Sequence, residues 1–168
     1  AGILAIGDEH GGAAEALMNL IADHAPADRR PGRSMAEAAA DVVQAARDAR
    51  RRLPGLGHRV HTVDPRVSVL FDLAADAGIA GDGSAFVHAL AAATTRLMKP
   101  IPINVDGALA GILYDLKFPA SAGKLIFIVG RVAGLTAEVA EEHAREKAMR
   151  IRIPVEYDGE PPRDIGAK

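Results

Sequence analysis

The sequence predicts an all-α fold from three observations. Of the 168 residues, 34 are Ala, while Trp is absent and only four Phe and two Tyr occur, so most apolar side chains are small enough for close helix packing. Apolar residues recur every three or four positions along most of the chain, which is the spacing of one helix face. Clusters of Gly and Pro interrupt that spacing and separate the helices. The 49% hydrophobic and 25% charged residues are typical of one globular domain.

Two helices are expected in the first third of the chain. The first follows the Gly11–Gly12 pair, carries apolar residues at helical spacing and ends before Pro26. The second begins after Ser34, which has the spacing of a capping box with Glu37, and is expected to continue to about Arg52. Its last turn would then be rich in arginines, which suit the negative end of a helix dipole. These arginines are Arg47, Arg50, Arg51 and Arg52.

A loop and two further helices are expected in the middle of the chain. Residues 53–58 cannot continue a helix, because their Pro lacks an amide donor and their two Gly permit unusual backbone angles. The Asp64–Pro65 pair has the N-cap and first-turn chemistry of a helix that lasts until Gly78. Ser84 is expected to open the next helix, which gives way to an extended segment at residues 99–102.

A short helix at residues 107–116 and a long one from Ser121 to about Glu146 complete the expected elements. In the long helix, Gly130 and Gly134 remove side chains from one face, which suits the close approach of another backbone. Residues 151–168 are polar and rich in Pro, and we expect an extended tail.

The charge and the absence of Cys narrow the range of function classes. A net charge of −2 lacks the positive field that binding to nucleic acid or an anionic membrane requires. No apolar run approaches the roughly 18 residues of a membrane span. Without Cys the chain has neither a disulfide framework nor a thiolate nucleophile, which agrees with a cytoplasmic location. No metal site is predicted, since no His, Asp and Glu residues stand at the spacing of a helical metal motif.

Three polar residues lie at breaks between expected elements, where a side chain can face a cleft. His10 and His58 each adjoin a Gly, which lets the backbone approach a ligand. Asp106 lies where an extended segment enters a helix, although an Asp at a helix start is also an ordinary N-cap. The other histidines are expected to be partly exposed or packed side chains. They are His24, His61, His88 and His143.

Taken in order, the segments around these three residues resemble the active-site motifs of the citrate synthase superfamily. The motifs are residues 8–16 (DEHGGAAEA), residues 54–61 (PGLGHRVH) with residues 64–66 (DPR), and residues 102–106 (PINVD). Each motif falls at an expected break between helices, and together they extend over most of the chain. The resemblance implies the helical fold of that family.

The resemblance also implies carbon–carbon bond chemistry on a coenzyme A thioester. Asp106 would exchange a proton with the acetyl methyl carbon, and His10 would donate a hydrogen bond to the thioester oxygen as enolate charge develops. His58 would move the proton on the oxygen of the second substrate, which in the family is oxaloacetate.

Binding residues for both substrates are implied in the same way. Guanidinium groups bind carboxylates with paired hydrogen bonds. The positions that match the family's carboxylate-binding arginines are Arg66, Arg131 and, more loosely, Arg152, the last acting from a partner subunit. The positions that match the coenzyme A adenine loop and a basic residue near its phosphates are Pro54, Gly55, Leu56, Gly57 and Lys99.

Within the family, the chain looks like the citryl-CoA lyase branch. This resemblance rests on residues 106–111 (DGALAG), 113–119 (LYDLKFP) and 157–163 (YDGEPPR). It implies the cleavage of citryl-CoA to acetyl-CoA and oxaloacetate. The alternatives are a citrate or 2-methylcitrate synthase, and a non-catalytic helical module that has kept the fold.

The resemblance further implies how the chain is divided and assembled. Family members carry another oxaloacetate-binding His and several helices ahead of the first motif, so we expect this chain to be a C-terminal portion. Residues 1–120 would be mainly the small catalytic and coenzyme A-binding domain, and residues 121–168 a long helix and tail of the large domain. A homodimer is expected, because the family pairs its subunits through long helices.

Overall fold

The computed structural model describes residues 3–4, 6–7, 11–58, 62–145 and 147. Within these ranges the chain forms helices and two isolated β-bridges but no strand, so the all-α class predicted from the sequence is confirmed. The elements are α1 (Ala13–His24), a short 3₁₀ helix (Ala27–Arg29), α2 (Met35–Asp48), α3 (Pro65–Asp76), α4 (Asp82–Leu97), α5 (Val105–Asp115) and α6 (Ala122–Arg145).

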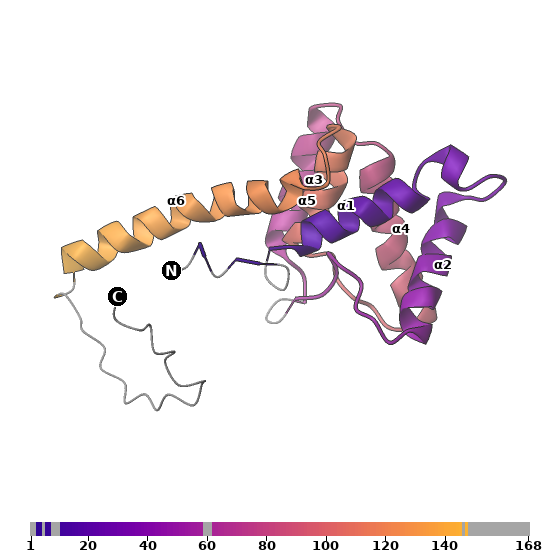
Figure 1. Cartoon of the computed structure of the whole chain (residues 1–168), viewed down its shortest axis with the longest axis horizontal. Coiled ribbons are helices and arrows are strands. Elements are labelled where there is room, and N and C mark those ends of the chain that lie inside the picture. Colours follow the sequence, from indigo (N-terminus) through magenta and orange to yellow (C-terminus); the bar gives the residue numbers. More distant parts are fainter. Residues whose placement is uncertain (1–2, 5, 8–10, 59–61, 146, 148–168) are drawn as a thin grey trace, which may run out of the picture.

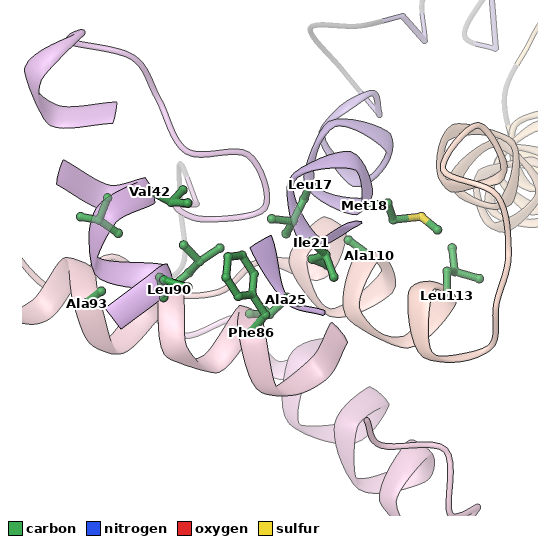
Figure 2. Close-up of a cluster of buried hydrophobic side chains, with 14 residues drawn as sticks. Leu17, Met18, Ile21, Ala25, Val42, Phe86, Leu90, Ala93, Ala110 and Leu113 are labelled. Carbon is green, nitrogen blue, oxygen red and sulfur yellow. The ribbon is translucent and has the colours of Figure 1, made fainter. Parts of the chain in front are cut away.

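The first five α-helices gather in one body, from which α6 extends (Figure 1). The helix α4 packs between α2 and α5, and α5 also packs on α1 and α3. Figure 2 shows the core at these contacts, with Phe86 of α4 between Leu90 of the same helix and Ile21 of α1. All three side chains are fully buried. No helix in the described part of the chain is both long and apolar enough to span a membrane.

The helix α2 begins as predicted but ends earlier. The amide of Glu37 donates to Ser34 Oγ (3.2 Å), and the Ser34 amide donates to the Glu37 carboxylate (2.8 Å), which together form the capping box. The helix then ends at Asp48, because Arg50 has a φ of 52° and the next amide, that of Arg51, donates to the Ala46 carbonyl (2.8 Å). The predicted extension to Arg52 is therefore wrong, and of the four arginines only Arg47 lies in the last turn.

The helix α4 begins two residues before the predicted Ser84. Its first amides donate to the carboxylate of Asp115, at the end of α5, from Gly81 (2.9 Å), Gly83 (2.7 Å) and Ser84 (3.0 Å). The Ser84 hydroxyl donates to the same carboxylate (2.7 Å). A side chain of α5 thus accepts the hydrogen bonds of the donors at the start of α4.

The long helix α6 matches its predicted range to within one residue at each end. It contacts α1 and α5, and a Cβ at Gly123 would stand 2.9 Å from the Glu15 amide nitrogen. Further along, Leu125, Val129, Val132 and Val139 are exposed. Apart from the neighbouring backbone of α6 itself, no atom of the described chain comes within 4 Å of a Cβ built at Gly130 or Gly134. The tail predicted for residues 151–168 lies outside the described residues.

Candidate active site

Two predicted motifs lie side by side in the structure. The loop that ends at His58 pairs with the segment that leads into α5, through an antiparallel bridge between Leu56 and Ile103. The Gly57 amide donates to the Pro102 carbonyl (2.7 Å), and the Asn104 amide donates to the Gly55 carbonyl (3.1 Å). This pairing brings His58 beside the segment that carries Asp106.

Close packing explains the glycines on both sides of this junction. Gly55 is buried with a φ of 74°, and a Cβ there would stand 2.8 Å from the Gly107 Cα and 2.5 Å from Leu17 Cδ2. A Cβ at Gly107 would stand 2.3 Å from the Gly55 oxygen. The loop therefore needs Gly55 to contact α5, whereas a Cβ at Gly57 would meet only Ile101, at 3.6 Å. Of these two loop glycines, Gly57 leaves more room for a ligand.

The N-terminus of α5 is capped by Asn104 and not by Asp106. Asn104 Oδ1 accepts the Gly107 amide (3.1 Å), while its Nδ2 donates to the Gly57 carbonyl (2.8 Å). Asp106 is the second residue of α5, and its Oδ1 atom is shielded from solvent. The interpretation of Asp106 as an ordinary helix cap is therefore wrong.

A buried carboxylate connects this junction to Arg66. Asp64 is 1% exposed, and its Oδ1 accepts Nε of Arg66 (2.9 Å) while its Oδ2 accepts Nη2 of the same side chain (2.8 Å). Its Oδ2 also accepts the amide of Val105 (3.1 Å), the first residue of α5. The hydrogen bond with the Arg66 guanidinium is the main cause that lowers the pKa of Asp64 to about 2.

Asp64 holds the Arg66 guanidinium from one side and leaves it open on the other. The Arg66 side chain is 55% exposed, so it can still receive a carboxylate from a ligand. Its pKa is raised chiefly by the hydrogen bond to Asp64, and the charge of Asp106 acts in the same direction. The candidate carboxylate-binding residue Arg66 therefore feels the charge of Asp106, the candidate proton-transfer residue.

A cavity of about 940 Å³ opens between α3, α4 and the segment before α5. Its lining includes Asp64, Phe71, His88 and residues 100–103, and it is mainly apolar. A pocket of this size and lining is typical of small-molecule and cofactor sites. Within the described residues, no group of three or more His, Asp or Glu side chains could hold a metal ion.

Some of the other predicted residues lie within the described part of the chain and some do not. His10 and Arg152 lie outside the described residues, as does His61. Lys99 is exposed two residues after the end of α4, and Arg131 is exposed on α6. His88 packs against Phe71 and His24 stacks on Phe86, as expected of packed side chains.

Two residues at the junction have structural roles that their sequence patterns do not indicate. Asp64 was expected only to cap α3, which it does by accepting the Arg66 amide (3.1 Å), and Asn104 was expected only as a motif residue. The local signal for Asp64 is its position two residues before an Arg. For Asn104 the signal is its position three residues before Gly107, which is the spacing of a side-chain cap.

Comparison with known proteins identifies the relatives of this chain. Residues 1–152 match the family model described as "Citrate synthase, C-terminal domain". The structure of citryl-CoA lyase from Hydrogenobacter thermophilus superposes with a TM-score of 0.76 at 35% identity, over 99% of this chain and 64% of that one.

Curated relatives include the citrate synthase of Haloferax volcanii, which is 30% identical over 92% of this chain and 39% of its own length. The 2-methylcitrate synthase of Shewanella oneidensis is 30% identical over 95% of this chain and 40% of its own length. The chain thus spans about two fifths of the length of these curated relatives.

Proposed function

The chain belongs to the citrate synthase family, and from this premise we propose that it acts as a carbon–carbon lyase that cleaves citryl-CoA into acetyl-CoA and oxaloacetate. The observation that carries the proposal is the pairing of the His58 loop with the segment before α5. This pairing joins the two motifs that supply the acid–base groups, and Arg66 lies beside them. The 35% identity to a citryl-CoA lyase favours the lyase direction.

In this proposal, His58 removes the proton from the hydroxyl group of citryl-CoA. The carbon–carbon bond then breaks, the oxygen becomes the ketone of oxaloacetate, and the bonding electrons move into the thioester as an enolate. His10 stabilises that enolate with a hydrogen bond to its oxygen. Asp106 delivers a proton to the enolate carbon, which completes acetyl-CoA. Exchange with solvent returns His58 and Asp106 to their starting states.

Three arginines would bind the carboxylates of the oxaloacetate portion. Arg66, already oriented by Asp64, is the best supported of them. Arg131 and, from a partner subunit, Arg152 would provide the others, which makes a homodimer part of the proposal.

Coenzyme A would lie along the loop of residues 54–57 and the adjoining cavity. The loop would receive the adenine, and Lys99 would lie near the phosphates. The cavity of about 940 Å³ supports this path, because its lining includes residues 100–103, directly after Lys99.

The proposal also covers the division of the chain and its location. Residues 1–120 would be mainly the small domain and residues 121–168 part of the large domain, with the protein in the cytoplasm. The exposed apolar side chains of α6 support an origin of this helix in a second domain, since such side chains are normally covered.

The substitution Asp106→Asn tests the proposal in the full-length gene product. Removing a positioned acid typically lowers turnover by about 10²–10⁴-fold. We expect a loss of this size in thiol release from citryl-CoA, with an unchanged circular dichroism spectrum. The matched control is Asp82→Asn, which changes an exposed carboxylate in the first turn of α4. Normal turnover by the Asp106 variant would remove this residue from the mechanism.

The same assay separates the two synthase alternatives from the lyase. If oxaloacetate condenses with acetyl-CoA or propionyl-CoA faster than citryl-CoA is cleaved, the protein is a citrate or 2-methylcitrate synthase. Both substrates are included because relatives of both kinds are 30% identical to this chain. Absence of activity in every direction would indicate a non-catalytic module.

A further inference from the structure

The side chain of Asn104 bonds to the backbone beside both candidate proton-transfer residues. Its Nδ2 donates to the Gly57 carbonyl (2.8 Å), and its Oδ1 accepts the Gly107 amide (3.1 Å). Gly57 directly precedes His58, and Gly107 directly follows Asp106.

Each of these hydrogen bonds fixes one peptide plane. The Gly57 carbonyl shares its peptide plane with the nitrogen of His58, and the Gly107 amide shares its plane with the carbonyl carbon of Asp106. One amide side chain therefore joins the peptide groups from which the two side chains project. A shift of about 1 Å in such groups can lower turnover by about 10²-fold.

We propose that Asn104 is a positioning residue, which sets the separation of His58 and Asp106 through its two side-chain hydrogen bonds. This inference rests on the proposed function, because the two side chains act together only in that reaction. The hydrogen bond that Asn104 donates to Gly57 distinguishes Asn from the other residues that cap helices. Asp or Ser can cap a helix as well as Asn does, but an ionised Asp cannot donate to Gly57, and a Ser hydroxyl is too short to reach both partners.

The variants Asn104→Ser and Asn104→Asp test the donor while they keep the cap. We expect kcat for citryl-CoA cleavage to fall by about 10–100-fold in both variants, because the reacting groups are displaced. The KM for citryl-CoA should stay within about threefold, since no ligand-binding side chain is removed. Asn104→Ser introduces no charge, so a loss in that variant cannot be caused by repulsion between a carboxylate and the Gly57 oxygen.

Ser34→Ala provides the matched control. It removes an N-cap of the same kind from α2, whose main packing partner is α4. Loss of that cap should lower the melting temperature by about 4 °C without a change in kcat. If both Asn104 variants keep kcat within about twofold of the parent, or if Ser34→Ala lowers kcat equally, the positioning role is overturned.

Amide hydrogen exchange provides a readout that does not depend on activity. In Asn104→Ser, the Gly57 amide, which donates to Pro102, should exchange at least about tenfold faster, while the Gly107 amide keeps its protection. Unchanged exchange at Gly57 overturns the inference. If the parent protein is inactive on every substrate, the proposed function fails, and the exchange rates still decide whether Asn104 holds the two peptides together.

Discussion

At the scale of single residues, the buried carboxylate of Asp64 links two helix starts through its hydrogen bonds. Its carboxylate accepts hydrogen bonds from the Arg66 guanidinium, from the Arg66 amide and from the Val105 amide, and it is almost completely buried. A buried charge is tolerated when its hydrogen-bonding capacity is satisfied, and removal of one partner is costly. Asp64 therefore joins the start of α3 to the start of α5 most strongly while it is ionised.

The pH dependence of stability should reveal this ionisation. The pKa of Asp64 falls from 3.8 to about 2 on folding, so its contribution is fully present above about pH 4 and is lost as the pH falls toward 2. At about 1.36 kcal/mol per pKa unit, the contribution is on the order of 2 kcal/mol. Thermal melts of the parent and of Asp64→Asn should therefore differ most near pH 5 and converge near pH 2. Melting curves that stay equally far apart across this range would contradict the assignment.

At the scale of elements, the contact between α4 and α5 depends on a cap that α5 supplies to the start of α4. Asp115 accepts three amides and one hydroxyl at the start of α4, and the carboxylate lies where the helix dipole favours negative charge. The backbones of α4 and α5 also approach closely, since a Cβ at Gly83 would stand 2.5 Å from the Gly111 oxygen. The positions of the two helices are thus fixed at their ends as well as along their apolar faces.

Removal of this carboxylate should loosen α4. We expect Asp115→Ala to lower the free energy of unfolding by about 2 kcal/mol, because several partly buried donors lose their acceptor. Urea denaturation measures the change. Asp76→Ala serves as the control, since Asp76 is exposed at the end of α3 and an acidic residue there opposes the dipole. Equal stability of the Asp115 variant and the parent would show that the apolar contacts alone hold α4.

At the scale of the whole molecule, the candidate site is assembled from segments that are distant in sequence. The His58 loop, the start of α3 and the start of α5 meet through backbone pairing and through Asp64. Lys99 is exposed and lies three residues before Pro102, whose carbonyl accepts the Gly57 amide.

Calorimetric titration of coenzyme A tests the role of Lys99. A lysine on a phosphate acts as an exposed point charge that salt screens. Lys99→Ala should therefore weaken binding by about three- to tenfold at low ionic strength and by much less at about 0.5 M salt. Lys117→Ala removes an equal charge at the exposed end of α5 and should leave the affinity unchanged. If the Lys99 variant binds coenzyme A as tightly as the parent at low salt, the phosphates do not bind near Lys99.

Local signals predicted most of the helices, and tertiary contacts explain the errors. Ser34 and Asp64 cap the helices that follow them, so the starts of α2 and α3 could be read from the sequence. The start of α4 could not, because its cap comes from a residue 31 positions beyond Ser84. The end of α2 could not either, because Arg50 adopts a left-handed conformation that is uncommon for a residue with a side chain.

The candidate site shows the same division. The resemblance of three motifs indicated that His58 and Asp106 belong to one site, whereas their spacing in the sequence implies no contact. The roles of Asn104 and Asp64 depend on bonds across 47 and 41 positions, which no local pattern reveals.

The bond between Gly57 and Asn104 closes a loop of the chain across 47 positions, and α3 and α4 lie inside that loop. The entropy of closing a flexible loop grows only with the logarithm of its length, so even a doubling would cost about 0.6 kcal/mol. Insertions in the exposed turn after α3 should therefore leave the distance between the two halves of the site almost unchanged. A single residue inserted within residues 102–106 would instead shift the pairing by one position and separate Asp106 from its partners. The turn after α3 should therefore tolerate changes of length that residues 102–106 would not.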